Sequence, residues 1–184
     1  MFRFLDILIS VVGLLLSIPI CLAICVVGLI DTGSPLFFQT RVGQNKRPFV
    51  LVKFRTMRVG QPSVASHLSD PTGITPIGKF LRRTKLDEIP QLWNVVKGEM
   101  SIVGPRPCLY NQTELIAARD ASGVFAVRPG ITGLAQVNGI DMSNPTLLAE
   151  TDAKMVKAMA ISSYFRLILL TILGKGSGDR VRDL

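Results

Sequence analysis

Apolar residues dominate the first part of the chain, and no charged residue occurs from Ile7 to Ile30. At about 1.5 Å per residue, a straight helix over this segment would extend about 36 Å, which is enough to cross the hydrocarbon core of a bilayer. Pro19 lies inside the segment, and a proline removes a backbone hydrogen bond and kinks or breaks a helix. Ser17 carries a hydroxyl that is a candidate partner for a freed carbonyl. The pattern predicts a membrane helix over residues 4–30, interrupted near Ser17–Pro19, and leaves open whether it spans the membrane or turns back.

After residue 31, short apolar runs alternate with turn signals. Leu36–Thr40 and Phe49–Phe54 predict the two strands of a hairpin. Residues 59–76 have no periodicity and predict a long loop. Further predicted elements are short helices over Gly78–Arg83, Pro90–Val96 and Leu109–Ala121, a strand over Leu134–Val137, and a long helical pattern over Pro145–Leu173. The later part of that pattern, residues 158–173, fits either a core helix or a helix in the lipid headgroup layer.

These elements predict a mixed α/β fold with a small sheet and several helices. The predicted organisation is a membrane segment over residues 1–30, one folded domain over 31–173 and a flexible tail over 174–184.

Composition narrows the range of partners. The chain carries 21 Lys and Arg against 13 Asp and Glu, for a net charge of +8, and residues 1–31 contribute Arg3, Asp6 and Asp31, so the remainder carries +9. This surplus suits anionic lipid headgroups or phosphorylated substrates on the cytoplasmic side. Nucleic acid is disfavoured because the cations are not interleaved with aromatic residues outside Phe54. A single histidine, His67, disfavours a histidine triad or zinc cluster, and three cysteines give no even disulfide framework.

The candidate chemistry centres on Asp87 and Glu88, which directly follow the cations of Arg82–Lys85. Adjacent carboxylates repel, and one proton stays bound unless cations compensate. An ionised carboxylate can attack phosphorus and form an acyl phosphate, and Mg2+ binds carboxylates and phosphate oxygens together. Pro90 favours a helix start, where a nearby anion gains about 0.3–1 kcal/mol. The alternative is that the pair only caps this helix and pairs with its basic neighbours.

Four further cations are candidates for binding phosphate. Arg106 lies between two prolines and Arg128 precedes a Pro-Gly turn, so less entropy is lost when either planar guanidinium binds an oxyanion. Lys53 and Arg55 alternate along a predicted strand and would share one face. Taken alone, each is equally consistent with a cation on a surface turn or on the solvent face of a strand.

Several segments also match one family in order and spacing: Gly33–Gly43, Lys53–Met57, Leu86–Val95, Lys97–Pro107 and Arg128–Val137. On these residues the chain resembles the bacterial sugar transferases, specifically the small monotopic phosphoglycosyl transferases. The resemblance implies transfer of a sugar-1-phosphate from a UDP-sugar to undecaprenyl phosphate, with release of UMP, at the cytoplasmic face of the bacterial inner membrane. It leaves open which sugar is carried and whether the protein forms a homo-oligomer.

The resemblance also implies roles for individual residues. Asp87 matches the family nucleophile and Glu88 its catalytic partner, with Mg2+ expected at Asp87 and Glu88. The positions expected around the phosphates and nucleotide are Lys53, Arg106, Arg128 and Asp152. Arg55, which alternates with Lys53 along the predicted strand, is a further candidate for substrate binding. The alternative function is a non-enzymatic membrane anchor whose basic face recruits anionic lipids or partners.

The implied fold is a compact α/β domain with a re-entrant N-terminal helix, broken at Ser17 and Pro19, and interfacial amphipathic helices. Two departures from the family pattern stand out. Ile18 separates Ser17 from Pro19, where the family often has adjacent Ser-Pro, and residues 153–156 lack the aromatic residues that usually follow Asp152.

Overall fold

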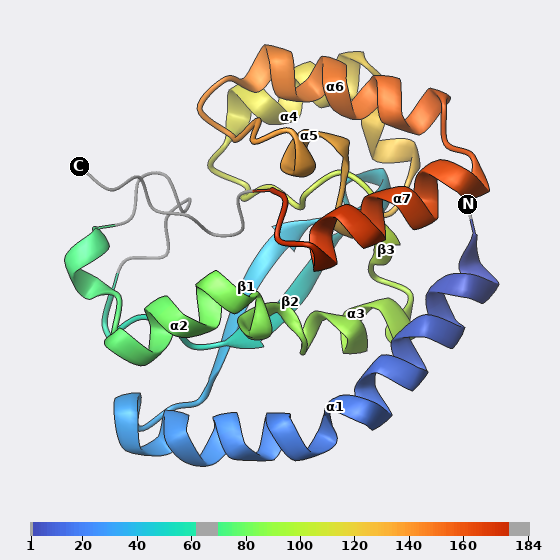
Figure 1. Cartoon of the computed structure of the whole chain (residues 1–184). Helices are drawn as coiled ribbons and strands as arrows, with labels where there is room; N and C mark the ends of the chain where they lie inside the picture. The colour runs from blue at the N-terminus through green and yellow to red at the C-terminus, as the bar shows by residue number, and fades with distance from the viewer. Residues whose placement is uncertain (1, 62–69, 177–184) are drawn as a thin grey trace.

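The computed structural model describes residues 2–61 and 70–176, which form a mixed α/β fold of helices around small sheets (Figure 1). In Figure 1, α1 and then α2 and α3 lie below the central hairpin, and α4, α5 and α6 lie above it. The elements, in order, are α1 (Arg3–Thr32), β1 (Leu36–Val42), η1 (Gln44–Lys46), β2 (Pro48–Phe54), η3 (Pro71–Gly73), α2 (Pro76–Thr84), η4 (Leu86–Glu88), α3 (Gln91–Lys97), β3 (Ser101–Val103), α4 (Thr113–Ala121), η5 (Val124–Ala126), β4 (Gly130–Thr132), α5 (Leu134–Val137), α6 (Pro145–Lys157) and α7 (Ile161–Ile172). His67 and residues 177–184 of the predicted tail lie outside the described residues, as do positions 62–69 of the predicted loop.

The apolar segment forms a single helix, α1, which is long and apolar enough to cross a membrane. Pro19 lies inside it, and Figure 1 shows the helix curving around the rest of the molecule. The Ser17 hydroxyl donates to the carbonyl of Leu14 at 3.0 Å. In a regular helix the missing N–H of Pro19 would bond to the carbonyl of Leu15, so the hydroxyl meets the carbonyl one residue earlier. The predicted interruption is therefore a bend within a continuous helix.

Both ends of α1 contact the same domain. Near its start, Arg3 donates to the carbonyl of Val96 at 3.1 Å. Asp6 is 2% exposed, and its carboxylate accepts hydrogen bonds from Ser101 Oγ at 2.8 Å, Ile102 N at 3.0 Å and Tyr164 Oη at 2.8 Å. Burial, followed by the hydrogen bond to Asp6, raises the pKa of Tyr164. Near the other end, Asp31 accepts a hydrogen bond from Thr75 Oγ1 at 2.7 Å. The first and last turns of α1 are thus fixed to one body.

The predicted hairpin is confirmed. β1 and β2 pair antiparallel in a register that runs from Leu36 opposite Phe54 to Val42 opposite Pro48. Asn94 of α3 is fully buried and binds the outer edge of β2, because its side chain accepts from Val52 N at 3.1 Å and donates to the carbonyl of Val50 at 2.7 Å. This contact anchors α3, and therefore the turn that precedes α3, against the hairpin.

A second small sheet was not predicted. β3 pairs with β4 in parallel, with Ser101 opposite Gly130 and Val103 opposite Thr132. The predicted strand over Leu134–Val137 is wrong, since those residues form the short helix α5. The strand in this region is β4, a few residues earlier, where the chain at the end of β3 comes into close backbone contact. A Cβ atom on Gly130 would lie 2.0 Å from the backbone nitrogen of Gly104.

The long helical pattern over Pro145–Leu173 divides into α6 and α7. At the break, the Ser163 hydroxyl accepts a hydrogen bond from the backbone N–H of Ala160 at 3.0 Å and starts α7 as a separate helix. The new helix buries Tyr164 and Leu167 but leaves other apolar side chains exposed: Ile161, Phe165, Leu169 and Ile172. The helix therefore contributes to the core on one face and presents apolar surface on the other, and its place in the headgroup layer stays a prediction.

The core consists of clusters on either side of the chain that follows β3. One joins the hairpin, α3, β3, α6 and α7 through Phe49, Leu51, Val95, Met100, Ile102, Val103, Met155, Tyr164 and Leu167. Another joins the end of β1 to α4, α5 and α6 through Val42, Cys108, Leu115, Phe125, Ala135 and Leu148. Burial raises the pKa of the Cys108 thiol, as expected for a small apolar core residue. Residues 104–107 run between the clusters and carry Arg106.

Candidate functional site

The carboxylates lie in the short turn η4, between α2 and α3. Lys85 makes this turn by adopting a left-handed backbone conformation with φ of 58°. Its ammonium donates to the carbonyls of Lys175 at 2.8 Å and Thr171 at 3.3 Å, which connects the turn to the end of α7. Asp87 and Glu88 are 2% and 7% exposed, so both carboxylates are covered in this conformation.

Glu88 contacts a cation from a distant part of the chain. Its Oε1 atom accepts hydrogen bonds from Nη1 and Nη2 of Arg106, each at 3.2 Å. Within the described residues, Pro90 is the N-cap of α3 and no side-chain hydrogen bond caps that helix. The pair is therefore not a cap of α3, which removes part of the alternative reading. The contact between Glu88 and Arg106 places a guanidinium, a group that also binds phosphate, beside the carboxylates.

Arg106 also lines a small polar pocket on the hairpin. The residues around it are Arg41, Leu51, Lys53, Gln91, Arg106 and Pro107. Arg41, Lys53 and Gln91 are buried, so these polar side chains line the pocket with little exposure to solvent. Several cations around a small pocket favour binding of an oxyanion such as phosphate. Lys53 and Arg106 were expected from the sequence. Arg41 and Gln91 were not, because they gave no signal beyond their place in the family segments.

Lys53 lies in β2 and Arg55 directly follows the end of that strand, and both cations lie against the ring of Phe37. The Lys53 ammonium lies 5.6 Å from the ring centre of Phe37, and the Arg55 guanidinium lies 5.4 Å from it. Their other contacts differ, because Arg55 also donates to the carbonyls of Ser34 at 3.0 Å and Leu36 at 3.2 Å. Arg55 thereby fixes the link between α1 and β1, whereas Lys53 lines the pocket.

Arg128 contacts the C-terminal end of α3. Its Nε atom donates to the carbonyl of Gly98 at 2.8 Å, just beyond the end of α3, whereas Asp87 and Glu88 precede the start of that helix.

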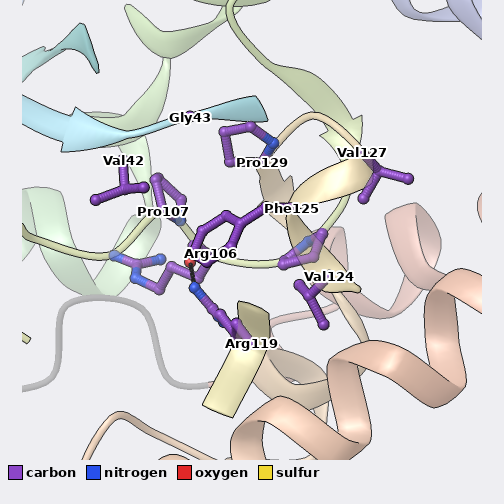
Figure 2. Close-up of a pocket in the computed structure, with 10 residues that line it drawn as sticks. Val42, Gly43, Arg106, Pro107, Arg119, Val124, Phe125, Val127 and Pro129 are labelled. Atoms are coloured by element: carbon purple, nitrogen blue, oxygen red, sulfur yellow. Dashed lines mark hydrogen bonds between the residues drawn. The ribbon is translucent and has the colours of Figure 1, made fainter. Parts of the chain in front are cut away.

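Asp152 is buried against Arg119, a residue that the sequence analysis did not identify. The carboxylate accepts from Nε of Arg119 at 3.0 Å and from Nη2 at 2.6 Å. Burial raises the pKa of Asp152, and the positive charge of Arg119 opposes that shift. The remaining arm of Arg119 donates to the backbone carbonyl of Arg106 at 2.8 Å, and Figure 2 shows this bond beside a second, mainly apolar pocket. Asp152 is thus connected to the site through Arg119.

Asp87 and Glu88 are also the candidate ligands for Mg2+. The described part of the chain contains no group of three or more His, Cys, Asp or Glu side chains placed to hold a metal ion. Mg2+ is commonly bound through one or two carboxylates, with substrate phosphates and water completing its shell. The adjacent carboxylates next to a cationic pocket fit a Mg2+ ion shared with a phosphorylated substrate.

Comparison with known proteins gives a consistent result. The family model described as bacterial sugar transferase matches residues 1–175. The chain is 35% identical to the galactosyl transferase CpsE of Streptococcus agalactiae, over 95% of the chain and 43% of that protein. It is 39% identical to the uncharacterized sugar transferase EpsL of Bacillus subtilis, over 85% of the chain and 77% of EpsL.

It is also 35% identical to the UDP-glucose:undecaprenyl-phosphate glucose-1-phosphate transferase of Escherichia coli, over 91% of the chain and 38% of that enzyme. The chain therefore spans less than half the length of CpsE and of the Escherichia coli protein.

Proposed function

Because the chain belongs to the bacterial sugar transferase family, we propose that it transfers a sugar-1-phosphate from a UDP-sugar to undecaprenyl phosphate and releases UMP. The Escherichia coli relative is named for this reaction with glucose-1-phosphate. The observation that carries the proposal is the contact between Glu88, the neighbour of Asp87 in the turn η4, and Arg106, which also lines a cationic pocket. A non-enzymatic lipid-binding anchor would have no need for buried carboxylates paired in this way.

In the first step, a carboxylate oxygen of Asp87 attacks the phosphorus that carries the sugar. The bond from that phosphorus to the bridging oxygen breaks, and UMP leaves with the electron pair. In the second step, a phosphate oxygen of undecaprenyl phosphate attacks the same phosphorus, and the acyl phosphate bond breaks to regenerate the Asp87 carboxylate. The acceptor needs no strong general base, because its attacking oxygen is already anionic.

Arg106 is suited to bind the phosphate during its transfer. Its side chain is 21% exposed, against 8% for Glu88, so the guanidinium is the accessible member of the pair. A phosphate offers the same planar pair of acceptors as a carboxylate, and Arg106 can exchange Glu88 for substrate. Lys53 in the pocket would add a second positive charge. Asp87 is covered in this conformation, and movement of Arg106 away from Glu88 would also open the site to substrate.

Mg2+, held by Asp87 and Glu88, would supply further neutralisation of the charge that develops on the phosphoryl oxygens. Within the same site, Arg106 and Lys53 orient the phosphate, and the surrounding core excludes water from the acyl phosphate.

We also propose that α1 is re-entrant at the cytoplasmic face of the bacterial inner membrane. The contacts of Arg3 and Asp6 at one end, and of Asp31 at the other, support this geometry, since a spanning helix would place its ends on opposite sides. The exposed apolar residues Phe165, Leu169 and Ile172 of α7 would lie in the interfacial layer.

Labelling of a Phe2→Cys variant in which the native cysteines are replaced tests this topology. Re-entry predicts that membrane-impermeant thiol reagents reach residue 2 from the cytoplasm, and labelling from the opposite side would refute it.

The reaction is tested by UMP release from a panel of UDP-sugars with undecaprenyl phosphate, with and without Mg2+. Asp87→Asn and Asp87→Ala are expected to abolish turnover and the trapped phosphosugar adduct. Asp120→Asn is the matched control, because Asp120 is exposed and pairs with Lys46 on the surface. Substantial turnover in both Asp87 variants would refute the nucleophile assignment. No UMP release from any UDP-sugar, together with lipid binding that survives Asp87→Ala and Arg106→Lys, would favour the anchor.

A further inference from the structure

Each residue of the segment Pro105–Cys108 accepts a hydrogen bond at its backbone carbonyl. The donors come from separate parts of the chain: Gly130 N to Pro105 O at 2.9 Å, Arg119 Nη1 to Arg106 O at 2.8 Å, Arg41 Nη1 to Pro107 O at 3.0 Å, and Val42 N to Cys108 O at 2.9 Å. Prolines at 105 and 107 fix φ on both sides of Arg106. The backbone from which the Arg106 side chain extends therefore has little freedom to rotate.

Arg119 is the donor whose burial costs free energy, because its side chain is charged. It is 1% exposed, and its charge is balanced by Asp152, which is also 1% exposed. Burying two charges is expensive unless their remaining hydrogen-bonding groups are satisfied. Here the guanidinium uses Nε and Nη2 for the carboxylate and Nη1 for the carbonyl of Arg106. A buried ion pair adds little net stability on average, so its position at this one carbonyl needs another explanation.

We propose that Arg119, held by Asp152, is a positioning residue that fixes Arg106 for its contacts with Glu88 and the substrate phosphate. The inference rests on the proposed function. In Figure 2 the Arg106 guanidinium extends away from Phe125, while Arg119 approaches the Arg106 backbone from the opposite side. Because the guanidinium lies at the end of a long side chain, a small backbone rotation displaces it strongly. A displacement of about 1 Å at a reacting group can cost about 100-fold in rate. Asp152 then acts through Arg119 and does not itself contact substrate.

The test removes the buried pair without leaving one charge unpartnered. In the full chain in lipid nanodiscs, Arg119→Met combined with Asp152→Leu replaces the pair with apolar side chains, a change that buried ion pairs often tolerate. We expect kcat for UMP release to fall about 10- to 100-fold, with a Tm close to that of the wild type. Lys46→Ala combined with Asp120→Ala removes an exposed ion pair that also involves α4 and should leave both values unchanged.

A double-mutant cycle separates positioning from general structural damage. In an Arg106→Ala background, the Arg119→Met and Asp152→Leu pair should cause no further loss of rate, because the group that it positions is gone. The same fold-loss in both backgrounds, or full activity of the double variant, would overturn the proposal. Arg119→Lys gives a second test if the apolar pair does not fold. It keeps a charge opposite Asp152 but loses the planar fork, and we expect a rate loss with the fold retained.

A readout without turnover keeps this inference separate from the proposed function. In arginine-labelled wild-type protein, the Nη–H resonances of Arg106 should be resolved in NMR spectra because Glu88 restricts guanidinium rotation, and Arg106→Lys assigns them. In the apolar double variant they should collapse to an averaged signal. Wild-type protein without UMP release would refute the reaction alone. Resolved Arg106 signals in the double variant would refute the positioning role.

Discussion

Gly78 offers a sharp test, because helix propensity and tertiary packing predict opposite effects of the same substitution. It lies in the first turn of α2, where the helix meets the chain that leaves β2. A Cβ atom at this position would lie 2.0 Å from the carbonyl oxygen of Thr56 and 2.7 Å from its carbonyl carbon. An ordinary contact begins near 3.4 Å, so α2 would retreat by the difference between 3.4 Å and 2.0 Å, or 1.4 Å.

The energetic terms can be compared directly. Propensity alone predicts that Gly78→Ala stabilises α2 by about 0.8–1.0 kcal/mol. Overpacking against a rigid backbone costs about 1–3 kcal/mol or more, so we expect net destabilisation of about 1–2 kcal/mol. The shift would also strain the bond from Arg82 Nε to Thr56 Oγ1, now 2.8 Å, near the end of α2 that leads to Asp87. A displacement of this size predicts a loss of about 100-fold in UMP release.

Equilibrium unfolding in mild detergent and UMP release in nanodiscs measure the two effects. Gly13→Ala is the matched control, because a Cβ atom there meets only the tip of Leu92, at 3.1 Å, and that side chain can turn aside. We expect the control to be neutral or slightly stabilising and fully active. If Gly78→Ala increases stability by the propensity value and keeps wild-type turnover, the close approach of α2 to Thr56 has no role in placing the carboxylates.

Three further substitutions test the supports of the site by unfolding measurements. Asp6→Ala leaves buried donors such as Ile102 N without their acceptor and should cost about 3–5 kcal/mol; a loss under about 1 kcal/mol would contradict this. Tyr164 has a pKa raised above its ordinary 10.0, so above pH 10 the unfolded state releases a proton that the folded state keeps. Wild-type stability should therefore fall relative to Tyr164→Phe by about 1.4 kcal/mol per pH unit, and parallel profiles would exclude it. Asn94→Ala should cost about 1–3 kcal/mol and lower UMP release, and unchanged values for both would argue against its anchoring of α3.

The sequence predicted correctly those helices and strands whose pattern depends only on residues close together in the chain. The hairpin, the long apolar helix and the helix after Pro90 follow from alternation, hydropathy and proline placement, and each forms within a few residues of its predicted bounds. The prediction of a strand over Leu134–Val137 was wrong because the position of β4 depends on its pairing with β3, which lies about thirty residues earlier in the sequence. A short apolar run does not encode which neighbour will approach it.

The same distinction applies to the site. Asp87 and Glu88 were identified because adjacent carboxylates among cations are chemically distinctive. Arg119 was missed because it occurs in a charged helical stretch that resembles any solvated surface. Only the folded chain reveals that it is almost completely buried against Asp152. Burial of a charged side chain is a tertiary property, and it depends on where α6 packs.

The connection of Asp6 to the folded domain also constrains the order of events during protein synthesis. Its partners Ser101 and Tyr164 lie 95 and 158 positions later in the sequence. As the ribosome extends the chain, α1 is synthesised before these partners, and its bond to Tyr164 cannot form until α7 has left the exit tunnel. Until then α1 lacks one of the contacts that hold its beginning. Its docking belongs to the last stage of maturation, and nascent chains arrested before residue 161 would lack the Tyr164 contact.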